Sequence, residues 1–385
     1  MSALSTGPVS PPQPPPRRVA STSERTRGDR GPAIPDDLSS RRIGRRLLEL
    51  AGAGALIGMF ILAGPGIGSL RNQIAHASGR WLVVGVVLEV LSTLSYVVIF
   101  RAVFCRRMSW RLSYQFGMAE QGANSVLSVS GAGGLALGAW ALRRGGMSTE
   151  HIARRTVAFF FLTSLANVGT LVVFAALYAT GVLQRDPDPA LTYLFGVGAA
   201  VATAVVAFGL PRLRPTSAPA RPAPGRIAKA AAFLRESLGL GVRDSVHMLR
   251  RRPTSILAGS IGTMAFDLAV LLVCFKAFRY SPPLGVIALG YMIGQLGGNI
   301  PIPGGIGGLD AGLIGTFALY HQPLVATSAA VLVYHAISLW VPALGGSVAF
   351  MQLRGTLRRE AQPTAMCMPL AEPIQSVRLP APSGA

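Results

Sequence analysis

Residues 295–320, QLGGNIPIPGGIGGLDAGLIGTFALY, decide the predicted fold. The stretch begins and ends as an apolar helix, but two prolines and several glycines interrupt its middle. Proline removes a backbone donor and glycine permits tight turns, so a continuous helix is not expected there. A broken helix within lipid leaves backbone polar groups that only protein or a water-filled cavity can satisfy. The stretch therefore predicts a re-entrant hairpin that lines a polar site.

An earlier stretch repeats this pattern. The octet GAGGLALG, which begins at position 131, matches the octet GIGGLDAG, which begins at position 305, at five of eight positions. Asn124 precedes the first octet and Asn299 the second, with one residue fewer between asparagine and octet in the second copy. Paired hydrophobic segments that Gly or Pro interrupts in corresponding halves are typical of transporter binding sites.

The composition is typical of a membrane protein. Half of the residues are hydrophobic, and the net charge of +20 comes almost wholly from arginine. The arginines stand at the ends of apolar stretches, where they set topology and contact anionic head groups, so we expect no nucleic-acid partner. Cys105, Cys274 and Cys367 lack metal or disulfide spacing, so we expect unpaired thiols, no bound metal and no cofactor.

Six uninterrupted apolar stretches are long enough to cross a bilayer, which takes about 20 residues. They are residues 47–70, 81–104, 156–183, 190–210, 254–278 and 324–353. Two further stretches, 112–142 and 284–320, are interrupted and are predicted as re-entrant hairpins. The predicted fold class is an all-α polytopic membrane protein with six full spans and two hairpins, eight hydrophobic segments in all.

The positions of the arginines predict from which side each hairpin enters. Both flanks of 112–142 are basic, so the positive-inside rule places its two ends on the cytoplasmic side. The same rule, applied to the spans that follow, predicts that 284–320 enters from the outside. Two hairpins from opposite faces make an inverted repeat whose tips meet near the middle of the bilayer.

The remaining segments are predicted as tails and a linker. Residues 1–46 are predicted as a disordered tail and 354–385 as a second tail, both cytoplasmic. The basic linker 211–253 separates a first membrane half, 47–210, which contains an added return span, from a second half, 254–353. Apolar residues at gaps of three and four within this linker predict an amphipathic helix, either on the inner leaflet or solvated. The expected location is the plasma membrane.

Acidic residues within the apolar segments are the first candidates for function. They are Glu89, Glu120, Asp267 and Asp310. A charge in the bilayer costs at least about 2.5–3.5 kcal/mol, so each should face protein or water. Asp310 either caps a helix start or holds a cationic group or a proton of a substrate. Glu120 and Asp267 either serve function or pair with Arg101 or Lys276.

The predicted substrate-binding residues lie in the two hairpins and the last span. They are Asn124, Ser130, Gly133, Gly134, Asn299, Pro301, Pro303, Gly304, Gly305, Gly307, Asp310 and His335. Asn124 and Asn299 serve either as ligand contacts or as partners of backbone groups that the helix breaks leave free. No hydrolase, metalloprotease or phosphate-loop motif is present, so no catalytic residue is predicted.

The sequence PIPGGIGGLDAG (301–312), followed by YHAISLWVPALGG (334–346), resembles the lysylphosphatidylglycerol synthase transmembrane family, a flippase-like membrane domain. Members usually have Glu where this chain has Asp310, and often Arg where it has His335. The resemblance covers about 47–353 and implies movement of a phospholipid or lipid-linked head group between leaflets. Some members carry a soluble aminoacyltransferase domain; this chain has no room for one, so no synthase activity is expected.

The leading functional prediction is a lipid flippase or scramblase that is not an enzyme, with anionic phospholipid or lipid-linked head groups as partners. Three alternatives stay open. One is an ion-coupled transporter of a small polar solute, and another is a non-catalytic partner of a cell-envelope enzyme. The third is a membrane-embedded enzyme with Asp310 and His335 as acid and base, which needs the two side chains within hydrogen-bond reach.

Overall fold

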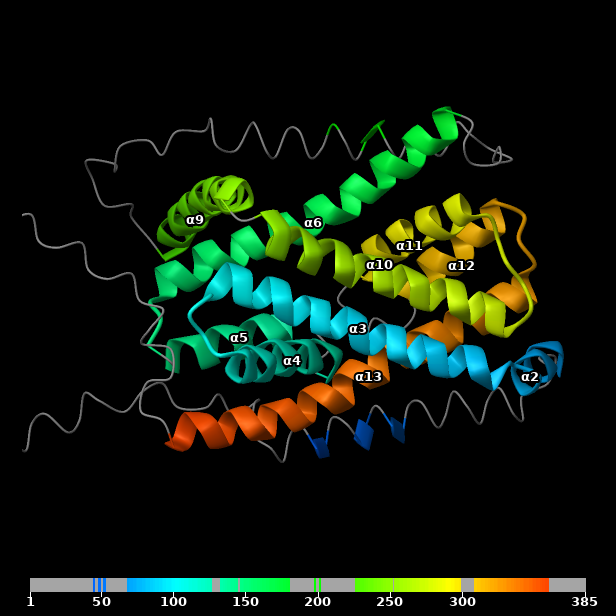
Figure 1. Ribbon diagram of the computed structural model, residues 1–385, viewed down its shortest axis with the longest axis horizontal. Helices are drawn as coiled ribbons and strands as arrows, with labels where there is room; N and C mark the ends of the chain where they lie inside the picture. Colours follow the sequence, from blue (N-terminus) through cyan, green and yellow to red (C-terminus); the bar gives the residue numbers. More distant parts are fainter. Residues whose placement is uncertain are drawn as a thin grey trace, which may run out of the picture. The chain divides into compact units, whose positions relative to one another are not determined.

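The computed structural model describes residues 44–45, 48–49, 51–52, 68–126, 132–144, 146–180, 197–198, 201, 226–251, 253–298 and 308–359. These residues form helices and turns, and no strand occurs among them, which confirms the predicted all-α class. The helices, drawn in Figure 1, are α2 (Gly68–Ala75), α3 (Gly79–Phe104), α4 (Trp110–Val126), α5 (Ala132–Arg144), α6 (Thr149–Ala179), α9 (Arg226–Arg251), α10 (Pro253–Ala277), α11 (Leu284–Gly298), α12 (Gly308–Leu319) and α13 (Leu324–Arg359).

Four of these helices are long and apolar enough to cross a membrane: α3, α6, α10 and α13. They coincide with four of the six predicted spans, so the chain is a multi-pass membrane protein. The other two predicted spans, 47–70 and 190–210, lie almost wholly outside the described residues. The total of six spans therefore stays a prediction.

Four shorter helices form two pairs. The helices α4 and α5 pack on each other, as do α11 and α12, and their lengths of 17, 13, 15 and 12 residues fall short of a bilayer crossing. The pairs coincide with the predicted hairpins 112–142 and 284–320. The segments that join each pair, 127–131 and 299–307, lie outside the described residues.

Local hydrogen bonds explain where several helices begin. The N–H of Leu112 donates to Ser109 Oγ (3.2 Å), and the N–H of His151 donates to Ser148 Oγ (3.3 Å). Serine at these positions satisfies backbone donors that have no partner within the helix. The cap at Ser148 explains why α6 begins before residue 156, where the apolar stretch begins.

Three helices end in the same hydrogen-bonded motif. A residue just after the helix takes a positive φ, at Gly146 (97°), Arg279 (56°) and His321 (55°). At each end the next amide donates to a carbonyl five residues back, for example Tyr280 to Phe275 (3.2 Å). This motif stops α5, α10 and α12 sharply and turns the chain back. The Tyr280 hydroxyl also donates to Gln322, which joins the ends of α10 and α12.

The two closest helix contacts bring the halves of the chain together. The helix α3 packs along α10, and α4 packs along α13. At the second crossing Gly122 and Gly346 meet: a Cβ on Gly122 would lie 2.6 Å from the Gly346 Cα. Small residues at such a crossing let two helix backbones approach closely, which is the main source of attraction between helices in lipid.

The order of helix lengths repeats along the chain. The helices α3 and α10 begin at positions 79 and 253, and α4 and α11 begin at positions 110 and 284. The helices α5 and α12 begin at 132 and 308, and α6 and α13 begin at 149 and 324, so the offset between corresponding helices is nearly constant. Contacts repeat too, since α3 touches α13 as α10 touches α6. Each half thus contains a long helix, a short pair and a second long helix.

The predicted amphipathic helix of the linker is α9. It packs on α6, where Val242 and Ser245 are buried and Arg154 contacts Asp244 (3.1 Å). A Cβ on Gly241 would lie 2.6 Å from Val157 Cβ, so the two helices touch closely. Part of the apolar face of α9 is therefore covered by α6 rather than left for the lipid surface.

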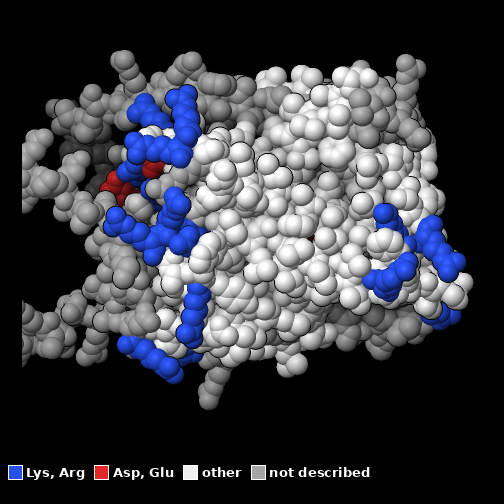
Figure 2. Space-filling model, viewed as in Figure 1, with Lys and Arg blue, Asp and Glu red and all other residues white. Residues whose placement is uncertain are grey.

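The basic residues lie mostly at the helix ends. Figure 2 shows Lys and Arg gathered at two ends of one face, with a broad region between them that is largely free of charge. This pattern is expected of helices that cross the hydrocarbon region.

One expectation about cysteine was wrong. Cys105 is disulfide-bonded, whereas Cys274 is free and buried within α10. Sequence spacing did not indicate this bond, because a disulfide depends on which chain segments meet in the fold.

Candidate functional site

The structure describes five of the predicted substrate-binding residues. These are Asn124, Gly133, Gly134, Asp310 and His335. The other seven, Ser130, Asn299, Pro301, Pro303, Gly304, Gly305 and Gly307, lie outside the described residues. The site is therefore built from the helices that flank the two breaks.

Asp310 and His335 meet directly. Asp310 lies in the first turn of α12, His335 lies on α13, and Asp310 Oδ1 is 2.8 Å from His335 Nδ1. The two side chains are 14% and 12% exposed, so they are mostly buried yet still reachable. The start of a helix favours a negative charge, which suits a carboxylate at this position. The arrangement makes a polar pair between two apolar helices that can accept or donate a proton or hold a charged group.

Asn124 supports the backbone of the first short pair. Its Oδ1 accepts a hydrogen bond from the Gly134 N–H (2.8 Å), which lies near the start of α5. A Cβ on Gly134 would overlap this amide, so glycine is needed for the contact. Of the two roles predicted for Asn124, partner of a free backbone group is the one observed.

Asp267 lies at the centre of a polar network that sequence reasoning missed. Its Oδ2 accepts hydrogen bonds from Tyr291 (2.6 Å) and Gln295 (3.4 Å), and its Oδ1 accepts one from Tyr334 (3.0 Å). These donors come from α11 and α13, whereas Asp267 is on α10. A hydrogen bond to a charged group contributes about 1.5–3 kcal/mol, so three donors can offset much of the cost of burial.

Lys276 and Arg101 are engaged elsewhere, so the suggested ion pairs were wrong. The Lys276 ammonium lies over the Trp81 ring, 5.2 Å from its centre. The Arg101 guanidinium donates to the Met108 carbonyl (2.9 Å) and lies 4.4 Å from the Trp110 ring centre. Aromatic faces attract cations, and both sites lie at helix ends rather than near the buried acids.

The other two buried acids lie on α3 and α4. Glu120 lies near Tyr96, and its carboxylate lies against Gly138 of α5. Glu89 is 5% exposed, and its Oε2 has no hydrogen-bond partner within the part of the chain that the structure describes. Glu89 thus differs from Asp267 and Asp310, each of which has a hydrogen-bond partner.

The spacing of Tyr291 and Gln295 in the sequence could have predicted part of this network. Residues four apart lie on one helix face, so both side chains point to the same side of α11. The sequence could not have predicted that Tyr334 belongs to the network, because only the packing of α13 beside α10 brings it to Asp267.

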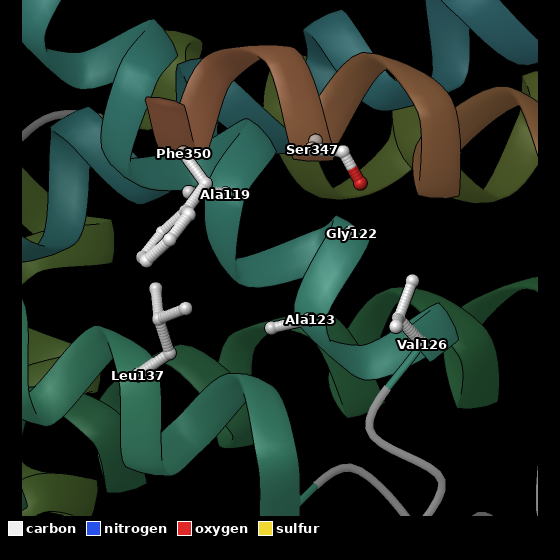
Figure 3. A pocket seen from close by; sticks show the side chains of 8 residues that line it. Ala119, Gly122, Ala123, Val126, Leu137, Ser347 and Phe350 are labelled. Carbon is white, nitrogen blue, oxygen red and sulfur yellow. The ribbon is translucent and has the colours of Figure 1, made fainter. Parts of the chain in front are cut away.

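A pocket beside the first short pair is too small for a ligand. It lies where α4, α5 and α13 meet, and Figure 3 shows Ala119, Ala123, Leu137 and Phe350 around it. Its volume of about 10 Å³ would hold about one water molecule. Among the described residues no group of three or more His, Cys, Asp or Glu is placed to hold a metal ion.

The chain was compared with known proteins. The family model described as lysylphosphatidylglycerol synthase TM region matches residues 46–346. This match includes α2 to α12, both short pairs, and Asp310 and His335. No curated protein matches the chain.

Proposed function

Because the chain belongs to the lysylphosphatidylglycerol synthase transmembrane family, a family of membrane regions linked to lipid and cell-envelope metabolism, we propose that it moves a lipid between the two leaflets. The ligand would be a phospholipid or a lipid-linked head group. In this proposal the chain binds and releases the lipid unchanged, and it is not an enzyme.

The observation that carries the proposal is the contact between Asp310 and His335. The pair lies at the start of a helix of only 12 residues, between apolar helices, and both side chains remain partly accessible. An ionisable pair within apolar spans is costly and is generally found where a ligand or an ion passes. A lipid head group that carries an ammonium or phosphate offers the charge and the hydrogen bonds that this pair requires.

A separate apolar groove suits the acyl chains. It has a volume of about 390 Å³ and lies between α6 and α10, where Leu162, Ala166 and Leu257 are among its lining residues. Val173 and Ile261 also line it and are 55% and 52% exposed, so the groove opens at the surface of the helices. In lipid such a surface contacts acyl chains.

We further propose that the two halves form an inverted repeat with the short pairs inserted from opposite faces. The nearly constant offset between corresponding helix starts supports a repeat, and the opposite directions of the corresponding helices α3 and α10 support its inversion. The arginine-rich ends of α3, α5 and α13 would face the cytoplasm under the positive-inside rule, as would both termini. The membrane would be the plasma membrane.

Lipid translocation in reconstituted vesicles tests the proposal. Full-length protein is placed in vesicles that carry head-group-labelled lipids of one class at a time, and an impermeant quencher is added outside. Wild type should expose inner-leaflet label to the quencher. Asp310→Ala should slow this by about tenfold or more, which corresponds to the loss of one hydrogen bond to a charged group.

Two controls accompany this experiment. Asp310→Glu keeps the carboxylate that other family members have and should keep activity. Gly315→Ala lies on the same helix, where an added methyl meets no atom within 4 Å, and should behave as wild type. If folded wild type moves no lipid class, the proposal is wrong.

One observation favours a second candidate, a membrane-embedded enzyme that acts on a lipid. The 2.8 Å distance between Asp310 and His335 is the distance expected of a carboxylate that orients an imidazole for acid–base chemistry. Mass spectrometry of lipids recovered from the same vesicles tests it. A new lipid species that appears with wild type and not with His335→Ala would favour the enzyme.

A further inference from the structure

Two acids lie at the same level of the interior, at a distance from both ends of their helices. Glu89 lies ten residues after the start of α3 at Gly79, and Asp267 lies ten residues before the end of α10 at Ala277. Those helix ends are joined, since the Ser78 N–H donates to the Ala277 carbonyl (2.9 Å). Because α3 and α10 pack along each other in opposite directions, both acids lie at one depth, about 15 Å from that end.

The two acids differ in how they are held. Asp267 accepts hydrogen bonds at both of its oxygens, as a carboxylate does when it is ionised. Glu89 is 5% exposed, and its Oε2 has no hydrogen-bond partner among the described residues. A buried carboxyl oxygen of this kind needs a proton, a cation or a water molecule, because an unpaired buried charge is strongly disfavoured.

Among the described residues, the groups that interact with both acids supply no positive charge. Those that interact with both acids are Cys274 on α10, Tyr291 on α11 and Tyr334 on α13, all neutral in their ordinary protonation states. His335 follows Tyr334 on α13 but contacts Asp310. Two carboxyl groups at one depth in an apolar interior disfavour each other's ionisation, which favours a proton on one of them.

We propose that Glu89 and Asp267 form a proton-binding site in which one exchangeable proton resides on Glu89 while Asp267 stays ionised. A proton from water adds to the Glu89 carboxylate, forms an O–H bond and lowers the negative charge of the pair from two to one. Release to water reverses the step. The site does not depend on lipid movement, but it would give a lipid transporter an ion to couple to.

Infrared difference spectroscopy of the purified full-length protein tests the site without any lipid assay. A protonated carboxylic acid has a carbonyl stretching band that the ionised form lacks. Wild type should show such a band from a buried acid, and the band should disappear as the pH is raised. Glu89→Gln, which keeps the shape of the side chain, should abolish it.

Matched variants identify which acid gives rise to the band. Glu120→Gln alters an acid that is equally buried but lies on α4 near Tyr96, and it should leave the Glu89 band in place. Asp267→Asn removes the neighbouring negative charge that favours the protonated form of Glu89. In that variant the Glu89 band should therefore disappear at a lower pH than in wild type.

Three results would overturn the proposal. The first is a wild-type spectrum with no titratable band from a buried carboxylic acid, which requires no variant to fold. The second is a band that Glu89→Gln leaves unchanged. The third is loss of the band on addition of sodium at constant pH, which would make the pair a sodium site. Each result leaves the translocation test of Asp310 unaffected, so the two proposals can fail separately.

Discussion

The two aspartates of the second half, Asp267 and Asp310, show how surroundings assign different roles to one residue type. Asp267 is held by three donors from two other helices, which fixes its position and satisfies its oxygens. Asp310 contacts the imidazole of His335 and keeps part of its side chain accessible. Asp267 is thus held within the protein, whereas Asp310 stays reachable and is the residue that we propose for ligand contact.

Removal of one donor tests how much the network around Asp267 stabilises the fold. Tyr334→Phe should lower the free energy of unfolding by about 1–3 kcal/mol, because it leaves a buried carboxylate oxygen without its hydrogen bond. Denaturant titration of the purified protein in detergent measures this. Tyr114→Phe on α4, outside the network, should have little effect. Equal stability of Tyr334→Phe and wild type would show that water replaces the hydroxyl at no cost.

Sequence reasoning located the acids but not their partners. The free-energy cost of placing a charge in lipid is enough to predict that four acids must face protein or water: Glu89, Glu120, Asp267 and Asp310. The partner of each depends on which helices lie side by side, and Tyr334 is far from Asp267 along the chain. The expected partners Arg101 and Lys276 were wrong for that reason.

At the scale of elements, the crossing of α4 and α13 is closely packed. A Cβ on Gly346 would overlap the Gly122 Cα and the Met118 carbonyl oxygen, so neither helix can move aside without a backbone shift. The adjacent Gly345 differs, since its Cβ would meet the end of the Met118 side chain at 2.9 Å. That methyl group can rotate away.

These neighbouring glycines make a matched pair of variants. Gly346→Ala should destabilise the protein by about 1–3 kcal/mol, at the upper end because the obstruction is backbone, whereas Gly345→Ala should cost less. Yield of folded protein on size-exclusion chromatography and a denaturant titration measure both. If the two variants are equally stable, the helices do not cross at Gly122 and Gly346.

The elements were predicted better than the site. The linker helix, both short pairs and four spans follow from apolar periodicity, length and breaks at Gly and Pro. The early start of α6 was missed because the cap at Ser148 extends the helix beyond its apolar part. The packing of α9 on α6 was also missed, since an amphipathic pattern does not say whether lipid or protein covers the apolar face.

At the scale of the whole molecule, the repeated helix order, together with the opposite directions of α3 and α10, predicts two halves of opposite orientation. Hydrogen bonds near the helix ends show which ends lie side by side. The start of α3 meets the end of α10, and the end of α10 contacts Gln322 just before α13. At the other end of α13, Thr356 donates to Gln115 near the start of α4 (3.1 Å).

Labelling of single cysteines from each side of the membrane tests this orientation most directly. Arg107 and Glu150 bracket the first short pair, and Ser281 and Leu324 bracket the second. In a background without the three native cysteines, an impermeant thiol reagent is applied to right-side-out and inside-out vesicles. Each variant must first be shown to fold.

Cysteines at 107 and 150 should react from one side only, and those at 281 and 324 only from the opposite side. That result requires each short pair to enter and leave on one face of the membrane. It also requires the two pairs to enter from opposite faces. Reaction of 107 and 150 from different sides would mean that the first pair crosses the bilayer. Reaction of all four positions from one side would mean that the halves are not inverted, and either outcome would contradict the account.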